Sequence, residues 1–259
     1  MSSTITQPTV LMYHGITAAR SPAPRERETG ADFYDVTAEN FRAQLRWLQE
    51  HLYRTVTIHK NLDVFSTKEI LLTFDDGEMN NYTVALPLLR KFDFMAHFFL
   101  IAKRVGKEGY LGWEQIRQLH AEGMVIGSHG FSHEILTHLL DTQIQEELSA
   151  SKKYLERNLG IPVESISIPR GFCNEKIIRM AHEAGYQYIF VSENPDSLQV
   201  NCFSRIAVKS KWTIDRFAQA MQGNAPVKDR ILASCKNGVK KMLGGSVYDW
   251  IRRMMLKIK

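Results

Sequence analysis

The sequence is poor in cysteine and has no long apolar run. Its three cysteines, Cys173, Cys202 and Cys235, are odd in number and show no CxxC spacing, which argues against a disulfide framework and against a thiolate zinc site. No stretch approaches the roughly 18 apolar residues of a transmembrane helix, and residues 1–9 lack the features of a secretory signal. These absences predict a cytoplasmic protein.

Basic residues are not in excess over the body of the chain. The formal net charge is +5, but residues 226–259 hold nine Lys or Arg against two Asp, so residues 1–225 carry a net charge of −2. The body therefore lacks the basic stripe that nucleic-acid binding requires. No Gly-rich phosphate loop is present either, which disfavours a phosphate-handling enzyme. We predict no nucleic-acid partner.

The chain does contain a regular alternation of apolar strands and amphipathic helices. The expected strands cover residues 9–13, 55–58, 70–74, 95–101, 124–128, 165–168, 187–191 and 203–208; the expected helices follow Thr37, cover 82–91, 113–122, 141–159 (capped by Asp141) and 175–184, and follow Thr213. Such alternation predicts a mostly parallel sheet. At a length of 259 residues, we expect one distorted (β/α) barrel of about seven strands, over residues 1–225.

Residues 226–259 fall outside this alternation and are predicted to form a basic, helical C-terminal extension. Val247, Ile251, Met254 and Ile258 fall on one helical face, and most basic side chains lie elsewhere. Such a helix either packs on the barrel or docks on an anionic membrane surface or an acidic partner. Docking on a membrane would place the protein at the inner membrane face.

Two carboxylates follow one apolar strand directly. In the segment LLTFDDGEMN, Asp75 and Asp76 end the strand and Gly77 allows a sharp turn. Adjacent side chains at a strand end diverge, so one carboxylate can bind a metal while its neighbour acts as a base. The alternative is an ordinary Asp-Asp-Gly turn without chemistry.

Two histidines follow another apolar strand. His129 and His133 lie four residues apart, so their imidazoles would face the same way and share one ion if the stretch begins a helical turn. A purely structural pair is the alternative. With Asp76, the two histidines would leave an open position for water, as in catalytic zinc sites. His14 and Arg170 also follow strands, and such residues converge on one mouth of a parallel barrel.

The segments TFDDG at residues 73–77 and HGFSH at residues 129–133 resemble the motifs of the polysaccharide deacetylase, or NodB-homology, family of carbohydrate esterases. The resemblance covers roughly residues 10–208. It implies that Asp75 is the catalytic base and that Asp76, His129 and His133 bind a divalent metal, zinc first and Co²⁺ or Ni²⁺ as alternatives.

The chain departs from the family pattern in two places, the segment that orients the catalytic base and the histidine that acts as general acid. The family often has Arg-Pro-Pro-Tyr on the next active-site strand, where this chain has Ser167 in place of the Arg and Arg170 in place of the Tyr. The family's late general-acid histidine is absent, since His182 is the last histidine. The Tyr-His pair ending at His14 resembles biofilm poly-N-acetylglucosamine deacetylases, which implies His14 as the acid. A hydrogen-bonding role at the barrel mouth is the alternative.

The residues predict a metal-dependent hydrolase, and the resemblance implies that it removes an N-acetyl or N-formyl group from an amino sugar of a polysaccharide or glycan precursor. Backbone N–H groups of Arg170, Gly171 and Phe172 are expected to stabilise the oxyanion. Two alternatives stay open: a deacylase of a lipid-linked or nucleotide-linked sugar at the cytoplasmic membrane face, and a catalytically silent carbohydrate-binding protein.

Overall fold

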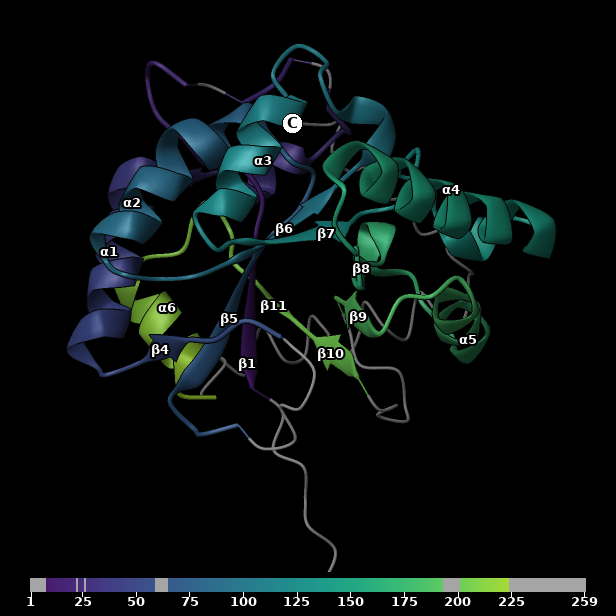
Figure 1. The fold of residues 1–259 in the computed structure, drawn as a ribbon. Coiled ribbons are helices and arrows are strands. Elements are labelled where there is room, and N and C mark those ends of the chain that lie inside the picture. Colours follow the sequence, from purple (N-terminus) through teal and green to yellow (C-terminus); the bar gives the residue numbers. More distant parts are fainter. Residues whose placement is uncertain (1–7, 22, 26, 59–64, 193–200, 224–259) are drawn as a thin grey trace, which may run out of the picture.

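The structure, a computed structural model, describes residues 8–21, 23–25, 27–58, 65–192 and 201–223. Strands at the centre are surrounded by helices (Figure 1). The main sheet contains β1 (Thr9–Tyr13), β4 (Arg54–Thr55), β5 (Glu69–Phe74), β6 (His97–Leu100), β7 (Val125–Ser128), β8 (Ser165–Ser167), β9 (Tyr188–Val191), β10 (Cys202–Ser204) and β11 (Ile206–Ala207). A second sheet pairs β2 (Ile16–Thr17) with β3 (Val36–Thr37).

The main sheet is a nearly closed parallel barrel. Its strand order is β10-β9-β8-β7-β6-β5-β1-β11, and β4 pairs with β5. The outer helices are α1 (Ala38–Glu50), α2 (Leu86–Lys91), α3 (Trp113–Ala121), α4 (Asp141–Leu159), α5 (Glu175–Glu183) and α6 (Ile214–Met221). The predicted distorted (β/α) barrel is confirmed, although the described residues form nine strands of this sheet where about seven were expected.

The alternating strand pattern divides the core into two parts. In β5, Ile70, Leu72 and Phe74 belong to the cluster that packs against the helices, whereas Leu71 belongs to a second cluster. This second cluster is aromatic: the ring centroids of Phe99 and Phe190 lie 4.9 Å apart. Because side chains on a strand point alternately to its two faces, we assign this second cluster to the barrel interior. Apolar packing therefore fills part of the interior.

The late strand differs from its prediction. The expected strand over residues 203–208 is two strands, β10 and β11, interrupted at Arg205. β10 pairs with β9 and β11 pairs with β1, so the chain passes at Arg205 from one edge of the sheet to the other. Apolar patterning predicts extended chain but not a change of neighbour, which is why the sequence suggested one strand.

Helix starts follow the sequence at α1 and α6 but depart from it at α4 and before α2. Thr37 and Thr213 cap α1 and α6, each accepting a hydrogen bond from the backbone N–H three residues on. The predicted cap Asp141 is wrong: Leu140 holds the cap position of α4 with extended backbone, and its N–H donates to Gln143 Oε1 at 2.9 Å. The chain before α2 forms a π-helical turn over Asn81–Ala85 instead of a regular α-helix.

Among the helices of the described ranges, none is long and apolar enough to cross a bilayer. The predicted basic extension, residues 226–259, lies outside the described residues. Its helicity, its amphipathic face and the division of the chain at residue 225 therefore stay predictions.

Candidate functional site

The carboxyl ends of the barrel strands surround a small pocket of about 90 Å³. His14 follows β1, Asp75 and Asp76 follow β5, and His129 follows β7. These four side chains line the pocket together with others, including His133, Arg170, Glu28 and Tyr34. The convergence expected from a parallel barrel is therefore present.

Three side chains in this pocket form a group that could hold a metal ion. One ligand atom each from Asp76, His129 and His133 lies within 4.8 Å of the others. Asp76 Oδ1 is 3.5 Å from His129 Nε2 and 3.6 Å from His133 Nε2. This oxygen is buried and accepts no hydrogen bond from the described residues. A buried carboxylate oxygen left between two imidazole nitrogens fits a divalent cation, because an ion would satisfy all three atoms.

In both histidines, Nδ1, the ring nitrogen that does not face Asp76, lies beside an oxygen that accepts a hydrogen bond. His129 Nδ1 lies 2.8 Å from the Ser167 carbonyl oxygen, and His133 Nδ1 lies 2.8 Å from Glu28 Oε1. Since those oxygens accept, each Nδ1 carries the proton and each Nε2 lone pair faces Asp76. Burial lowers the pKa of His129 to about 4, which favours the neutral form that a metal ligand needs.

The backbone that positions these ligands is not helical. Asp76 and His133 have φ values of 73° and 69°, a left-handed conformation that is rare for residues other than glycine. The helical turn that would align the histidine pair is therefore wrong. Instead, Glu147 on α4 holds the loop: its carboxylate accepts hydrogen bonds from the Phe131 and Ser132 N–H groups at 3.1 and 3.0 Å.

Asp75 is held by a residue that the sequence did not identify. Arg205 donates two hydrogen bonds to its carboxylate, at 2.7 and 2.8 Å, and a third to Ser167 Oγ at 2.7 Å. Burial alone would raise the pKa of Asp75, but the Arg205 guanidinium and His129 hold it well below its usual range. Arg205 thus supplies Asp75 with the cationic partner that Ser167, which stands in place of the family's Arg, cannot supply. In the sequence, this role was signalled by an arginine within an apolar strand pattern.

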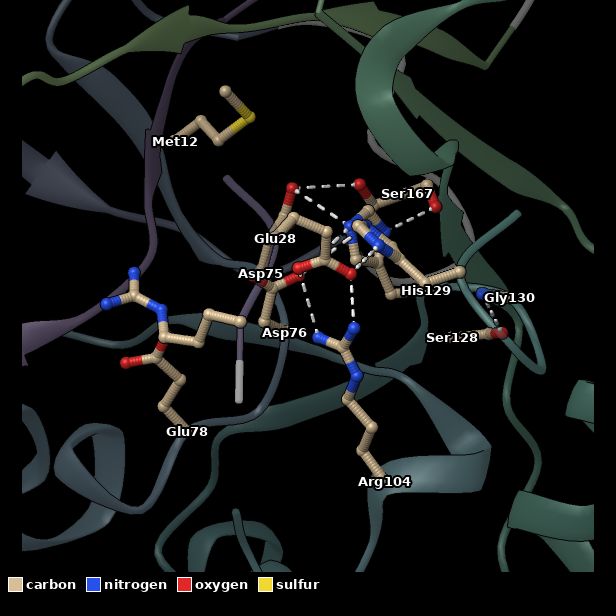
Figure 2. Close-up of polar contacts among 12 residues, drawn as sticks. Met12, Glu28, Asp75, Asp76, Glu78, Arg104, Ser128, His129, Gly130 and Ser167 are labelled. Carbon is tan, nitrogen blue, oxygen red and sulfur yellow. Dashed lines mark hydrogen bonds and ion pairs between the residues drawn. The ribbon is translucent and has the colours of Figure 1, made fainter. Parts of the chain in front are cut away.

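Glu28 is a second residue that the sequence did not identify. It lies in the polar segment between β2 and β3, and it contacts both His133 and Arg104. Figure 2 shows Glu28 close to Asp75, Asp76 and His129, with Arg104 reaching it from another side. Burial would raise the pKa of Glu28, but hydrogen bonds from His133 and Arg104 lower it. Its carboxylate therefore stays ionised as the outer partner of a candidate ligand.

His14 and the segment after β8 complete the pocket. The His14 ring stacks on Tyr34 with centroids 4.9 Å apart, and its Nδ1 is buried without a hydrogen-bond partner among the described residues. Arg170 lines the pocket and has a φ of 60°. Gly171 and Phe172 are not among the pocket-lining residues. Their oxyanion role stays a prediction.

The chain is similar to known polysaccharide deacetylases. The model of the polysaccharide deacetylase family matches residues 63–189. YxkH of Bacillus subtilis, whose name refers to polysaccharide deacetylase, is 32% identical over 69% of this chain and 62% of its own length. A poly-β-1,6-N-acetyl-D-glucosamine N-deacetylase of Staphylococcus aureus is 25% identical over 62% of each protein. The chain spans about six tenths of the length of these curated relatives.

A solved structure shares the fold. A polysaccharide deacetylase from Bacillus cereus superposes with a TM-score of 0.71 at 26% identity, over 83% of this chain and 69% of that one. The barrel inferred from the alternation of strands and helices therefore matches a known deacetylase barrel.

Proposed function

Because the chain belongs to the polysaccharide deacetylase family, we propose that it is a metal-dependent hydrolase that removes an N-acetyl group from an amino sugar of a glycan. One observation carries the proposal: the buried Asp76 Oδ1 lies between the Nε2 atoms of His129 and His133, beside an ionised Asp75. Three metal ligands next to an ionised carboxylate that does not belong to the ligand set can carry out metal-assisted hydrolysis of an amide.

Asp76, His129 and His133 would hold the ion. A divalent metal bound there would supply Lewis-acid chemistry, making water more acidic and polarising the amide carbonyl. Zn²⁺ is our first choice because two imidazoles and one carboxylate with an open position form a typical catalytic zinc set. Co²⁺ and Ni²⁺ suit the same ligands.

Asp75 is the proposed base. Its Oδ2 lies 3.7 Å from His129 Nε2, so it faces the ligand group, and it is 2% exposed. Arg205 and Ser167 fix its orientation. A fixed, ionised carboxylate can take the proton of the attacking water as the new C–O bond forms.

His14 is the proposed acid. The sequence has no histidine after His182, and the His14 ring, which lines the pocket, is fixed by stacking on Tyr34. As the C–N bond breaks, His14 would deliver a proton to the departing sugar nitrogen, leaving acetate and a free amine. Backbone N–H groups at Arg170 and Phe172 are the proposed donors to the oxyanion, whereas the predicted donor Gly171 N–H is already bonded to the Ile168 carbonyl oxygen at 3.2 Å.

The size of the pocket supports a small acyl group. Its volume is about 90 Å³, well below the roughly 300–1,000 Å³ of common ligand pockets. A small formyl or acetyl group suits such a space. Acetyl is our choice because the named relative from Staphylococcus aureus is an N-deacetylase.

The cell compartment is proposed on sequence grounds alone. The few cysteines without CxxC spacing support a cytoplasmic location, and the basic residues of 226–259 support contact with the inner membrane face.

The test is acetate release from N-acetylglucosamine oligomers by protein stripped with a chelator. Activity should disappear on stripping and return with Zn²⁺, Co²⁺ or Ni²⁺ added singly. Release that survives complete removal of metal would refute the metal-dependent mechanism. Stoichiometric metal binding without release from any N-acyl sugar would favour a silent carbohydrate-binding protein.

A further inference from the structure

A large open cleft adjoins the catalytic pocket. Its volume is about 1220 Å³, against about 90 Å³ for the pocket. Most of its lining comes from described residues of two parts of the chain, 20–21, 23–25 and 27–28 on the one hand and 104 and 107–110 on the other. Glu28 lines both spaces, so a ligand in the cleft is next to the group that contacts His133. We call this space the basic cleft, because its lining includes Arg20, Arg25, Arg27, Arg104 and Lys107.

Two of the five cations are already neutralised. Arg27 binds Asp35 at 2.7 Å and Glu78 at 2.9 Å. Arg104 binds Glu28 and donates to the Tyr110 hydroxyl at 3.1 Å. These pairs build the wall of the cleft and hold it beside the catalytic pocket.

The other three cations are uncompensated. Arg20, Arg25 and Lys107 are exposed, and within the described ranges none of them forms an ion pair. Among the lining residues that the structure describes, Glu108 is the one carboxylate besides Glu28. The cleft therefore presents net positive charge in a chain whose first 225 residues are net negative. Local charge of this kind attracts anions.

The walls of the cleft are well packed. Pro24 is buried, and a Cβ added to Gly109 would lie 2.8 Å from Pro24 Cβ. Gly109 also has a φ of 81°, which glycine adopts without strain. Ser21 and Thr83, whose hydroxyl oxygens lie 2.5 Å apart, add polar groups to the lining. Arginines and hydroxyls in one concave space are groups that bind phosphate or carboxylate oxygens.

We propose that the basic cleft binds an anionic group, a phosphate or a carboxylate, carried by the glycan whose N-acyl group enters the catalytic pocket. This inference rests on the proposed function, which it narrows to acidic or phosphorylated glycans. The cleft would also repel the amines that deacetylation produces, because they are cationic at neutral pH. Repeated deacetylation along a neutral amino-sugar polymer is therefore disfavoured.

The experiment compares three N-acetylglucosamine oligomers of matched length: a neutral one, one with a reducing-end phosphate, and one ending in a uronic acid. Oligomers of one to three sugars place the charge at increasing distance from the acyl group. With the metal-loaded protein at low salt, we expect KM to be about tenfold lower for at least one anionic oligomer than for the neutral one. The phosphate and carboxylate arms identify which anion is preferred.

Two double variants locate the effect. Arg25→Ala with Lys107→Ala should bring the ratio of neutral to anionic KM close to one. Arg46→Ala with Lys153→Ala removes the same charge from exposed positions outside the cleft and should keep the ratio. Equal KM values of the wild type for the neutral and both anionic oligomers would overturn the proposal. The proposal would also be overturned if the ratio of neutral to anionic KM fell equally in the two double variants.

If the proposed function is wrong, the protein releases no acetate from any oligomer, a result that differs from equal KM values. In that case, calorimetric titration with the phosphorylated and neutral oligomers still tests the cleft. Tighter binding of the phosphorylated oligomer that is lost in the Arg25→Ala and Lys107→Ala variant would support the cleft. Equal binding of both oligomers would overturn it.

Discussion

The catalytic pocket and the basic cleft share Glu28 but differ in whether their charged side chains are buried and paired. In the pocket, the charged side chains are buried and held: Asp75 is bound by Arg205, and His133 is bound by Glu28. In the cleft, Arg20, Arg25 and Lys107 are exposed and form no ion pair with another described residue. Fixed partners orient groups for chemistry, whereas unpaired cations remain available to a ligand. Changes in the pocket should therefore be far more damaging than changes in the cleft.

The largest effects are expected from removing a pocket ligand or the base. His133→Ala should abolish both metal binding and amide hydrolysis, because it removes one of three ligands. Asp75→Asn should keep the metal and lower kcat by about 10²–10⁴-fold, since the proton acceptor is lost. Metal analysis of the purified variants alongside acetate release separates the two roles.

The control for this pair is His138→Ala, a nearby histidine outside the pocket lining. It should retain metal and activity. Full activity in both His133→Ala and Asp75→Asn would contradict the assignment of these residues to the active site.

The next effect concerns Arg205. Arg205→Met leaves a buried carboxylate without its cationic partner, which should lower the free energy of unfolding by about 3–5 kcal/mol. The pKa of Asp75 is held low by Arg205, so its removal should raise that pKa. A base acts only when ionised, and the acid limb of kcat/KM should therefore move to higher pH. Denaturant unfolding and a pH–rate profile measure both effects.

Arg205→Lys is the matched variant for this prediction. It keeps the charge but loses the two-pronged contact with Asp75, so its acid limb should lie between those of the wild type and Arg205→Met. An unchanged acid limb in Arg205→Met would show that Arg205 serves folding alone.

The smallest effect is expected at Glu28, where the two regions meet. Glu28→Gln keeps the size of the side chain but removes its charge, which weakens the contact with His133 Nδ1. Outer partners of metal-binding histidines typically change metal affinity by about 10–100-fold. We expect a loss of that order in a competition titration with a chelator, together with kcat that recovers at saturating metal.

Glu134→Gln is the control for Glu28, because Glu134 is exposed and adjacent to His133 in sequence but does not line the pocket. It should leave metal affinity unchanged. Equal affinities in Glu28→Gln and the wild type would mean that the pocket is not organised through Glu28, and the contrast with the cleft would weaken.

Much of the fold was predictable from local patterns. Each apolar run that precedes a site residue, such as 9–13 before His14 and 70–74 before Asp75, contains a strand of the barrel. Period-2 and period-3.6 patterns report burial of one face, which is a local property. The division of the late chain into β10 and β11 was not predictable in this way, because the two strands differ in which neighbour they pair with, and pairing is not a local property.

The candidate site was predictable in part. Asp75, Asp76, His129 and His133 stand out because two short motifs follow apolar strands, and the structure brings them together. The way the histidine pair is aligned was not predictable, since His133 adopts a left-handed backbone conformation in a loop that Glu147, on the next helix α4, holds through the Ser132 N–H. The oxyanion role of Arg170, Gly171 and Phe172 stays untested.

The sequence by itself determined the strand and helix alternation and the residue types needed for a metal and a base, because both are encoded over a few neighbouring residues. Only the tertiary structure decided the partners of those residues. Arg205 lies 130 positions from Asp75, and Glu28 lies 105 positions from His133. Such pairs form only when the barrel closes, since closure sets which distant side chains share one buried, low-dielectric space where an unpaired charge is costly.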